Sequence, residues 1–386
     1  MPIALSPTVE FESAVPSTNR AFVLHGVEDV RFEERPVPSE LGSLEVIVAP
    51  KKTGLCGSDA HYLSHGSIGD YVLTSPMILG HESAGIVVKV GSAVTSLAPG
   101  DRVAMEPGES CRMCYSCKDG HYNRCPSMAF AATPPFDGTL AGFYKLPADM
   151  CYPLSHAVSL EEGALIEPLA VGVMAVTTIG QMPLGANVVV FGAGPVGLLT
   201  MAAAKALGAR HVLAVDIQEP RLEFAKQYAA SDYFVPTRTV EGETRLAYSR
   251  RQADEIKARF NYAERGPQGV DLIIDCTGAE ICVQTALYLL KHGGTYVQVG
   301  MGTDSLTIPI STVLNKELTV KGSFRYGPGI YTQAIDLVSR GLIDLKPLIT
   351  HRYAFVDAAK AFAANRAGKG EDGRALIKAV IDGPLA

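Results

Sequence analysis

The sequence lacks an excess of basic residues. Lysine and arginine together number 34 against 40 aspartate and glutamate residues, so the formal charge at pH 7 is −6 and the pI is about 5.9. A chain with this balance has no general attraction for nucleic acid or anionic lipid. Charged residues make up only 19% of the chain and hydrophobic residues 47%, which excludes disorder, coiled coil and collagen. We therefore expect neither a nucleic acid nor a membrane as a partner.

The chain also lacks a long uninterrupted hydrophobic run. The longest uncharged apolar stretch covers residues 188–204, near the lower limit for crossing a bilayer. Glycines and a proline at 192, 194, 195 and 197 interrupt it, so it is better interpreted as a strand, a turn and a helix. The first 20 residues show neither a secretory pattern nor an Arg-rich amphipathic one. The expected location is the cytoplasm.

The eight cysteines are spread unevenly. Four lie within 15 residues, at Cys111, Cys114, Cys117 and Cys125, and the others are Cys56, Cys151, Cys276 and Cys282. Since the cytosol keeps thiols reduced, a disulfide scaffold is disfavoured and a metal site is the first alternative. We interpret Cys151, Cys276 and Cys282 as core residues.

The chain has 386 residues, a length that suggests two or three domains. Its sequence shows two successive patterns of expected secondary structure. After a polar arm over residues 1–18, short β-type runs separated by Gly and Pro turns extend to about residue 153 and predict an antiparallel β domain. A capping box at Ser159 and Glu162 begins a long apolar helix. From residue 186 strands and helices alternate, which predicts an α/β fold with a parallel sheet covered on both faces. Polar residues 237–268, in which a helix is predicted at about 248–260, are interpreted as a surface excursion between strands.

A glycine-rich turn predicts a dinucleotide site. Gly192-Ala-Gly-Pro-Val-Gly197 follows an apolar strand and opens a helix, where unpaired N–H groups bind phosphates. Asp216 ends the next strand, in the position of an acid that binds the adenosine ribose and repels a 2′-phosphate. NAD is therefore favoured over NADP. The predicted cofactor-binding residues are Gly192, Gly194, Pro195, Val196, Gly197, Asp216 and Arg221, although a solvated arginine at a helix start is an equal alternative for Arg221.

Two metal sites of different kinds are predicted. The Cys111-x2-Cys114-x2-Cys117-x7-Cys125 lobe offers four thiolates, which suits a closed structural zinc. A dispersed set, Cys56, His81, Glu82 and Glu167, would leave an open coordination position, as in catalytic zinc sites. Taken singly, a lone histidine or cysteine is more often structural.

The Gly-His-Glu signature, the cysteine lobe and the Gly-Ala-Gly-Pro-Val-Gly turn, in this order, closely resemble zinc-dependent medium-chain dehydrogenases. The motif from Cys56 to Tyr62, the Ile-Glu-Pro context of Glu167 and Phe324-Arg-Tyr326 resemble the polyol branch of that family, and Gly327-Pro-Gly329 its fungal xylitol dehydrogenases. The resemblance implies a GroES-like β-rich catalytic domain (19–167 and 332–386) and a Rossmann, doubly wound NAD-binding domain (168–331). It also implies that Cys56, His81 and Glu82 bind the catalytic zinc and that Glu167 binds it directly or through water.

The resemblance further assigns roles in polyol oxidation. Ser58 would take the proton from the substrate oxygen and pass it through the cofactor ribose toward His61; a turn serine and a surface histidine are the alternatives. Tyr62, Tyr71, Arg325 and Tyr326 would line the substrate pocket, with an interdomain ion pair as the alternative for Arg325. Tyr71 departs from the phenylalanine common at its position, which leaves preferred chain length and stereochemistry open.

The resulting hypothesis is an enzyme that oxidises xylitol to D-xylulose with NAD and two zinc ions. Sorbitol or L-arabinitol dehydrogenase is the near alternative, a general secondary-alcohol dehydrogenase a more distant one, and a non-catalytic NAD-binding protein the alternative of another class. The family is commonly tetrameric, so a homo-oligomer is expected, and the apolar strand 295–299 near the sheet edge is predicted to pair across a two-fold axis.

Overall fold

The structure is a computed structural model, which describes residues 18–303 and 305–384. The chain forms two compact units, of which the first comprises the described parts of residues 1–111, 126–167 and 349–386 and the second comprises residues 112–125 and 168–348. Residues 112–125 and 332–348, which the sequence boundaries placed in the catalytic domain, thus lie in the second unit. The predicted arm lies outside the described residues except for Thr18, where the first strand begins.

The first unit is built from β-sheets. Its longer strands are β1 (Thr18–Gly26), β2 (Asp29–Pro36), β3 (Glu45–Gly54), β7 (Glu82–Val90), β8 (Arg102–Met105), β11 (Tyr144–Pro147), β12 (Cys151–Pro153), β19 (Ile349–Tyr353) and β20 (Lys378–Asp382). Its short strands are β4 (Ser67–Ile68), β5 (Tyr71–Val72), β6 (Met77–Ile78), β9 (Gly108–Glu109) and β10 (Ala129–Phe130). The main sheet has the order β12-β8-β7-β3-β20-β19, with β11 also paired to β3. All its pairs are antiparallel, as predicted, except β19 with β20.

Few helices accompany these sheets. They are α1 (Gly57–His65), α3 (Leu160–Ala164), α11 (Ala358–Ala367) and the start of α4 (Ile166–Met174). The predicted capping box is present, because Glu162 N donates to Ser159 Oγ and Ser159 N donates to Glu162 Oε2. The single long helix predicted after it is wrong: α3 ends at Ala164, and α4 is followed by a π-helical turn over Ala175–Ile179.

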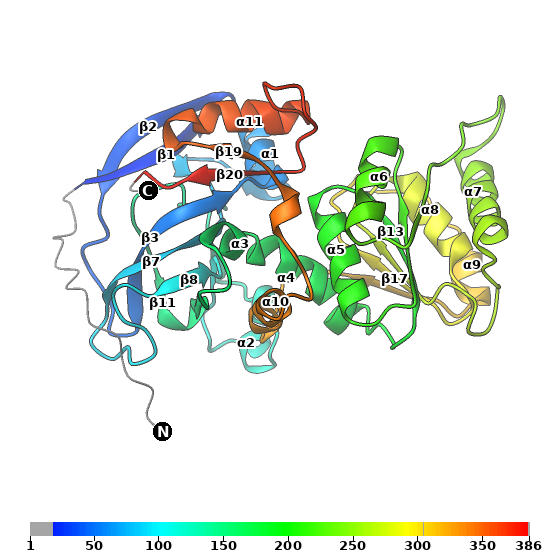
Figure 1. Ribbon diagram of the computed structural model, residues 1–386, viewed down its shortest axis with the longest axis horizontal. Coiled ribbons are helices and arrows are strands. Elements are labelled where there is room, and N and C mark those ends of the chain that lie inside the picture. The colour runs from blue at the N-terminus through cyan, green and yellow to red at the C-terminus, as the bar shows by residue number, and fades with distance from the viewer. Residues whose placement is uncertain (1–17, 304, 385–386) are drawn as a thin grey trace. The chain divides into compact units, whose positions relative to one another are not determined.

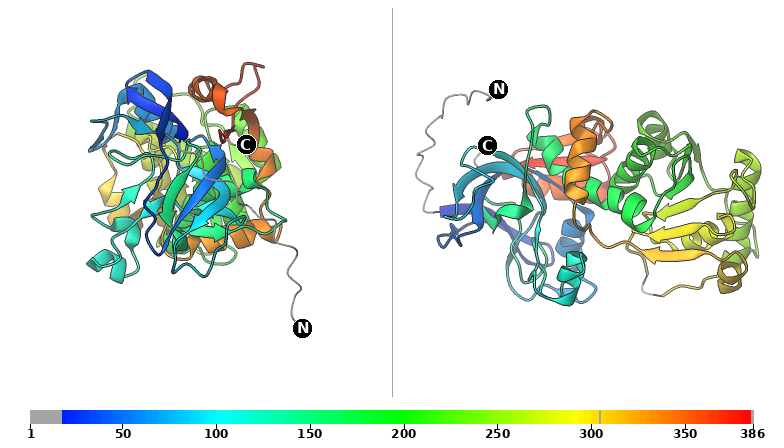
Figure 2. Two further views of the ribbon diagram at one scale, coloured as in Figure 1. Left: turned by 90° about the vertical axis from the view of Figure 1, so that its left-hand side faces the viewer. Right: turned by 90° about the horizontal axis from the view of Figure 1, so that it is seen from below.

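The second unit contains a six-stranded parallel sheet, as predicted. Its strands are β13 (Asn187–Phe191), β14 (His211–Val215), β15 (Asp232–Phe234), β16 (Leu272–Asp275), β17 (Thr295–Gln298) and β18 (Thr319–Gly322), in the order β15-β14-β13-β16-β17-β18. Its helices are α2 (Tyr115–Lys118), α5 (Pro195–Ala206), α6 (Glu219–Tyr228), α7 (Arg245–Phe260), α8 (Glu280–Leu289), α9 (Ile310–Asn315) and α10 (Ile330–Ser339). The chain winds outward from β13 in both directions, so right-handed crossovers place α5 and α6 on one face and α8 and α9 on the other. Figures 1 and 2 show helices on both sides of the strands.

The predicted pairing of strand 295–299 across a two-fold axis is wrong. Its residues form β17, which is hydrogen-bonded to β16 on one side and to β18 on the other. No backbone edge of β17 is left to bind a second chain. The free edge on this side of the sheet belongs to β18.

Two glycines of the turn after β13 make a sharp test of this architecture. A Cβ on Gly197 would lie 1.8 Å from the backbone oxygen of Gly192, whereas a Cβ on Gly194 would meet nothing within 4 Å. We expect Gly197→Ala to lower the free energy of unfolding by about 1–3 kcal/mol, since backbone must move to relieve the overlap. Gly194→Ala, the matched control, should unfold like the parent in a chemical denaturation measured by circular dichroism. Equal stability of the two variants would contradict the close approach.

Candidate metal and dinucleotide sites

Helix α1 and the ends of two strands bring the first group of predicted ligands together. Gly54 at the end of β3 is paired with Glu82 at the start of β7, and Cys56 follows two residues later as the N-cap of α1. Gly80 has a φ of +91°, a left-handed conformation that favours glycine, and it turns the chain into His81 and Glu82. The Sγ atom of Cys56, a ring nitrogen of His81 and a carboxylate oxygen of Glu82 lie within 4.8 Å of one another.

Asp59 orients the histidine of this group. Its Oδ1 accepts a hydrogen bond from Gly80 N at 3.1 Å and lies 3.3 Å from Nδ1 of His81. Burial opposes protonation of His81, but the carboxylate of Asp59 and the neighbouring Cys56 raise its pKa well above the usual value. A carboxylate behind one ring nitrogen is the arrangement that directs the other nitrogen at a metal. The sequence motif contains Asp59, but no role was predicted for it.

Lys378 is a second residue that sequence reasoning missed. Its buried Nζ donates to Glu82 Oε1 at 2.6 Å and to the backbone oxygen of Leu55 at 3.0 Å. Burial lowers the pKa of Lys378, but the negative charges of Glu82, Cys56 and Glu167 outweigh it and the net shift is upward. No local pattern predicts this contact, because Lys378 is 296 residues from Glu82 in the chain.

The remaining residues predicted around the catalytic metal lie at different depths. Glu167 is buried at 6% exposure, and its carboxylate is not among the ligand atoms that cluster within 4.8 Å. Ser58 Oγ donates to Cys56 Sγ at 3.2 Å. His61 lies on the exposed face of α1, whereas Tyr62 on the same helix is 3% exposed and packs in the hydrophobic core. Tyr71 on β5 is 47% exposed.

The four cysteines of the lobe converge as their spacing predicts. Their Sγ atoms lie within 4.8 Å of one another, and those of Cys114 and Cys117 are 3.5 Å apart. Helix α2 buries none of its residues, and Met113 and Tyr115 are 76% and 82% exposed. A loop with so little apolar burial needs a metal to hold it. Four thiols in this geometry fit the closed tetrahedral shell of structural zinc.

The lobe contacts the predicted substrate motif through one side chain. Asn123, 6% exposed between the third and fourth cysteines, donates from Nδ2 to the backbone oxygen of Phe324 at 2.9 Å. Next to it, Arg325 has a φ of +57° and lies over the Phe324 ring, 4.7 Å from the ring centroid. Tyr326 is buried edge-on against Tyr331 with ring centroids 5.1 Å apart. Asn123 had no predicted role.

The glycine-rich turn has the geometry of a phosphate site. Gly192 has a φ of +92°, Gly194 caps α5 at its N-terminus and Pro195 occupies the first turn of that helix. The carboxylate of Asp216, after β14, accepts hydrogen bonds from Ala193 N at 2.7 Å and from Gln218 N at 2.9 Å. Asp216 therefore holds the turn in place as well as lying beside the expected ribose position. Val196 contributes its backbone oxygen to Thr200 Oγ1.

A cavity of about 310 Å³ opens beside Asp216. Arg221 lines it, and its other walls include Ile217, Phe234, Tyr248, Gln252, Ile256 and Cys282. An apolar slot next to an acid fits an adenosine group. Tyr248, Gln252 and Ile256 come from α7, so the segment predicted as a surface excursion in fact supplies one wall. The apolar residues of α7 at helical spacing were the available signal.

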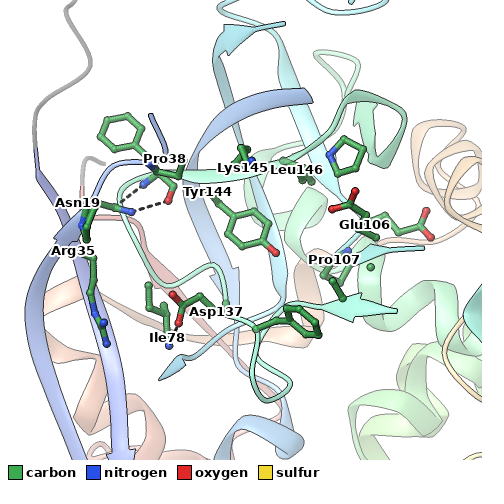
Figure 3. Close-up of a pocket in the computed structure, with 18 residues that line it drawn as sticks. Asn19, Arg35, Pro38, Ile78, Glu106, Pro107, Asp137, Tyr144, Lys145 and Leu146 are labelled. Carbon is green, nitrogen blue, oxygen red and sulfur yellow. Dashed lines mark hydrogen bonds between the residues drawn. The ribbon is translucent and has the colours of Figure 1, made fainter. Parts of the chain in front are cut away.

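A second hollow in the first unit contains none of the predicted site residues (Figure 3). Tyr144, Asp137 and Glu106 point into it, and the hydroxyl of Tyr152 donates to Glu106 Oε2 at 2.8 Å. Asp137 accepts a hydrogen bond from Ile78 N. These polar groups hold neighbouring segments of the unit together.

A three-residue metal cluster and a dinucleotide turn followed by an acid define a class of protein, the metal-dependent dehydrogenases that use a nicotinamide dinucleotide. Within the described chain, no helix is long and apolar enough to cross a membrane. The comparisons with known proteins agree with this class. Residues 42–156 match the alcohol dehydrogenase GroES-like domain family, and residues 195–340 match the zinc-binding dehydrogenase family.

Relatives extend the match over nearly the whole chain. D-xylulose reductase A of Aspergillus niger is 52% identical over 365 residues, which cover 95% of this chain and 97% of that protein. Probable D-xylulose reductase A of Aspergillus clavatus is 51% identical over 371 residues, 96% of this chain and 98% of that protein. The crystal structure of galactitol-1-phosphate dehydrogenase from Escherichia coli, 28% identical, has a TM-score of 0.80 and covers 94% of this chain and 99% of that one. The chain belongs to the zinc-binding dehydrogenase family, and the predicted fold class and family are confirmed.

The cysteine lobe generates a prediction about stability. We expect Cys114→Ser to reduce the zinc content from about two ions to about one per chain, because three thiolates bind less tightly than four. The free energy of unfolding should fall by roughly 3 kcal/mol or more as the lobe loses the metal that holds it. Thermal unfolding and elemental analysis would measure both changes.

Met113→Ser is the matched control, since it lies in the same loop, is 76% exposed and offers no metal ligand. It should keep the zinc content and melting temperature of the parent. If Cys114→Ser behaves in the same way, the lobe does not depend on a metal.

Proposed function

We propose that this protein is a zinc- and NAD-dependent polyol dehydrogenase that interconverts xylitol and D-xylulose. The observation that carries the proposal is the cluster of Cys56, His81 and Glu82, three potential ligands of which two are deeply buried. Three ligands leave one position of a tetrahedral metal open to substrate. The relatives are named D-xylulose reductase A, which supports D-xylulose as the ketose of this pair.

The donor set around the cluster fits zinc. A thiolate, an imidazole and a carboxylate are all zinc ligands, and the Lys378 ammonium offsets part of their negative charge. A zinc ion held by these residues would act as a Lewis acid and make the polyol hydroxyl easier to deprotonate. Glu167, buried and within electrostatic reach of Lys378, adds a fourth candidate ligand, directly or through water.

The chain's own residues provide an exit for the substrate proton. The Ser58 hydroxyl lies beside Cys56, and His61 stands one helical turn further along α1 with its ring exposed to solvent. A hydroxyl next to the metal ligands accepts and donates a proton in turn, and an exposed imidazole exchanges protons with water. Ser58 and His61 are thus the proposed proton relay.

A polyol panel tests the proposed function. Purified protein with NAD should oxidise xylitol faster than sorbitol, L-arabinitol or isopropanol, followed as NADH absorbance, and a chelator should abolish turnover. His81→Ala should remove activity because one of the three clustered ligands is lost. A protein with bound zinc that oxidises none of the polyols would refute the proposal, and a preference for isopropanol would replace it with a secondary-alcohol dehydrogenase.

Cofactor choice depends on Asp216. Asp216→Ser removes the carboxylate that repels a 2′-phosphate, while its hydroxyl can still accept one backbone hydrogen bond. We expect the ratio of kcat/KM values for NADP over NAD to rise roughly tenfold, a difference of about 1.4 kcal/mol. Steady-state kinetics with both cofactors measure this ratio, and an unchanged value would remove Asp216 from cofactor selection.

Substrate binding is assigned to the Phe324-Arg325-Tyr326 loop together with Tyr62 and Tyr71. The Asn123 hydrogen bond fixes the backbone of this loop at Phe324. Asn123→Ala should therefore raise the KM for xylitol by roughly two- to tenfold, the effect of one hydrogen bond worth about 0.5–1.5 kcal/mol. The KM for NAD should stay unchanged.

Asn365→Ala, a half-buried asparagine of α11, serves as the control for a general loss of stability. Parallel melting curves show whether either variant is unfolded. A KM for xylitol that does not change in folded Asn123→Ala protein would show that the loop keeps its shape without the lobe.

We propose a homo-oligomer that associates through the edge strand β18. Val320 on this strand is 52% exposed, and Ile310 and Leu314 on the neighbouring α9 are 65% and 78% exposed. An open strand edge beside exposed apolar side chains is suited to pairing with a second copy. None of the eight cysteines, all of which lie in the described chain, is in a disulfide, which is consistent with the proposed cytoplasmic location.

Val320→Lys tests this interface. A charged side chain on the edge strand should shift the protein to a smaller species in size-exclusion chromatography with light scattering, because the paired strands would exclude it. Val240→Lys, at a valine that is 62% exposed in another part of the unit, should leave the mass unchanged. A parent protein that is already monomeric would contradict the proposal.

A further inference from the structure

Two histidines on α1 form a pair outside the metal clusters described above. His61 and His65 are separated by one helical turn, and both are exposed. Their rings stack with centroids 4.2 Å apart and an interplanar angle of 18°. The opposite face of the helix, with Ala60, Tyr62 and Leu63, packs in the hydrophobic core, so the helix fixes both histidines on its solvent side.

This pair differs from five of the other seven histidines of the chain. Five of them have a polar side-chain partner: His25 with Glu33, His81 with Asp59, His121 with Asp119, His211 with Tyr262 and Asp232, and His351 with Thr350 and Asp372. Within the described chain, no hydrogen bond or ion pair involves the ring nitrogens of His61 or His65. Their lone pairs remain available while the two rings are already held together.

We propose that His61 and His65 form an exchangeable binding site for a late first-row divalent cation, such as Ni²⁺, Cu²⁺ or Zn²⁺. Residues at i and i+4 share one helix face, so both imidazoles reach one ion without a change of the backbone. Two nitrogens bound to one tetrahedral zinc at about 2.0–2.1 Å lie about 3.3 Å apart. In the structure the rings are stacked with centroids 4.2 Å apart, so rotation about the side-chain bonds of both residues would turn one nitrogen of each ring toward the same ion.

The position on the helix and the chemistry of the ligands support the same assignment. His65 lies in the last turn of α1, where the carbonyl ends of the helix dipole favour a cation. Imidazole nitrogen suits nickel, copper and zinc rather than magnesium or calcium. With two protein ligands and water completing the shell, the bound ion exchanges with solvent, in contrast to an ion enclosed by the four-cysteine lobe.

Nickel titration of the zinc-loaded protein tests the site. By isothermal calorimetry, the parent should bind one Ni²⁺ that His65→Gln binds at least roughly tenfold more weakly, because the second imidazole no longer contributes its chelate effect. His156→Gln replaces an exposed histidine elsewhere and should bind Ni²⁺ like the parent. Zinc content, measured before and after titration, should not change.

Two results would overturn the proposal. One is equal Ni²⁺ affinity of the parent and His65→Gln. The other is release of zinc in proportion to the Ni²⁺ bound, which would place the nickel in an existing zinc site. Circular dichroism of the variants would show that α1 remains folded, so that a loss of binding reports on the imidazole.

A kinetic consequence rests on the proposed function. If His61 releases the substrate proton, a metal on its ring should slow xylitol oxidation in the parent and leave His65→Gln unaffected. Selective nickel binding without this inhibition would leave the metal site standing and remove His61 from the proton path. The binding measurement therefore tests the metal site, and the rate measurement separately tests the role of His61 in proton release.

Discussion

The buried pair of Lys378 and Glu82 is the contact on which the metal cluster depends. An ammonium with so little solvent exposure is tolerated only because Glu82 and the carbonyl oxygen of Leu55 both accept hydrogen bonds from it. The contact joins three segments, namely the last strand, the end of β3 and the start of β7. Cys56 follows Leu55 directly and His81 precedes Glu82, so the position of each ligand is fixed by the same ion pair. Loss of either partner would leave a buried charge without compensation.

The two metal clusters solve different physical problems. The side chains of α2 in the lobe are not buried and provide no hydrophobic core. Four clustered thiols that can bind a metal stabilise the lobe instead. In the first unit, strand pairing and Asp59 hold the histidine before any ion binds, so the ligands are arranged by the fold rather than by the metal. Asn123 gives the lobe a further role, because its amide holds the backbone next to Arg325. A structural metal site and a candidate substrate loop are thereby mechanically connected.

The dinucleotide side of the molecule shows how backbone geometry and one carboxylate cooperate. Close contact between Gly197 and Gly192 sets the turn, and Asp216 accepts a hydrogen bond from within that turn. The acid that would select NAD is thus also a structural element of the phosphate site. One wall of the adenosine slot is formed by α7, which lies between β15 and β16 in the chain.

Much of this protein follows from local patterns in the sequence. The alternation of strands and helices predicts the parallel sheet, because a buried parallel strand must be uniformly apolar. The spacing of the four cysteines predicts a cluster, since ligands close in sequence meet without help from the rest of the fold. Periodicity did not reveal the split of the helix after Ser159, or the wall that α7 gives to the adenosine slot, because both depend on packing against other elements.

The sequence by itself determined the class of fold, the cysteine lobe and the phosphate turn, because each depends on a pattern within short segments of the chain. Only the tertiary structure decided that Lys378 neutralises Glu82, that Asp59 orients His81, that Asn123 reaches Phe324 and that β18 rather than β17 is the free edge. The physical reason is the same in each case. These contacts join residues that are distant in the chain or depend on the order of strands in a sheet. Neither distant contacts nor strand order produces a periodic pattern in the amino-acid sequence.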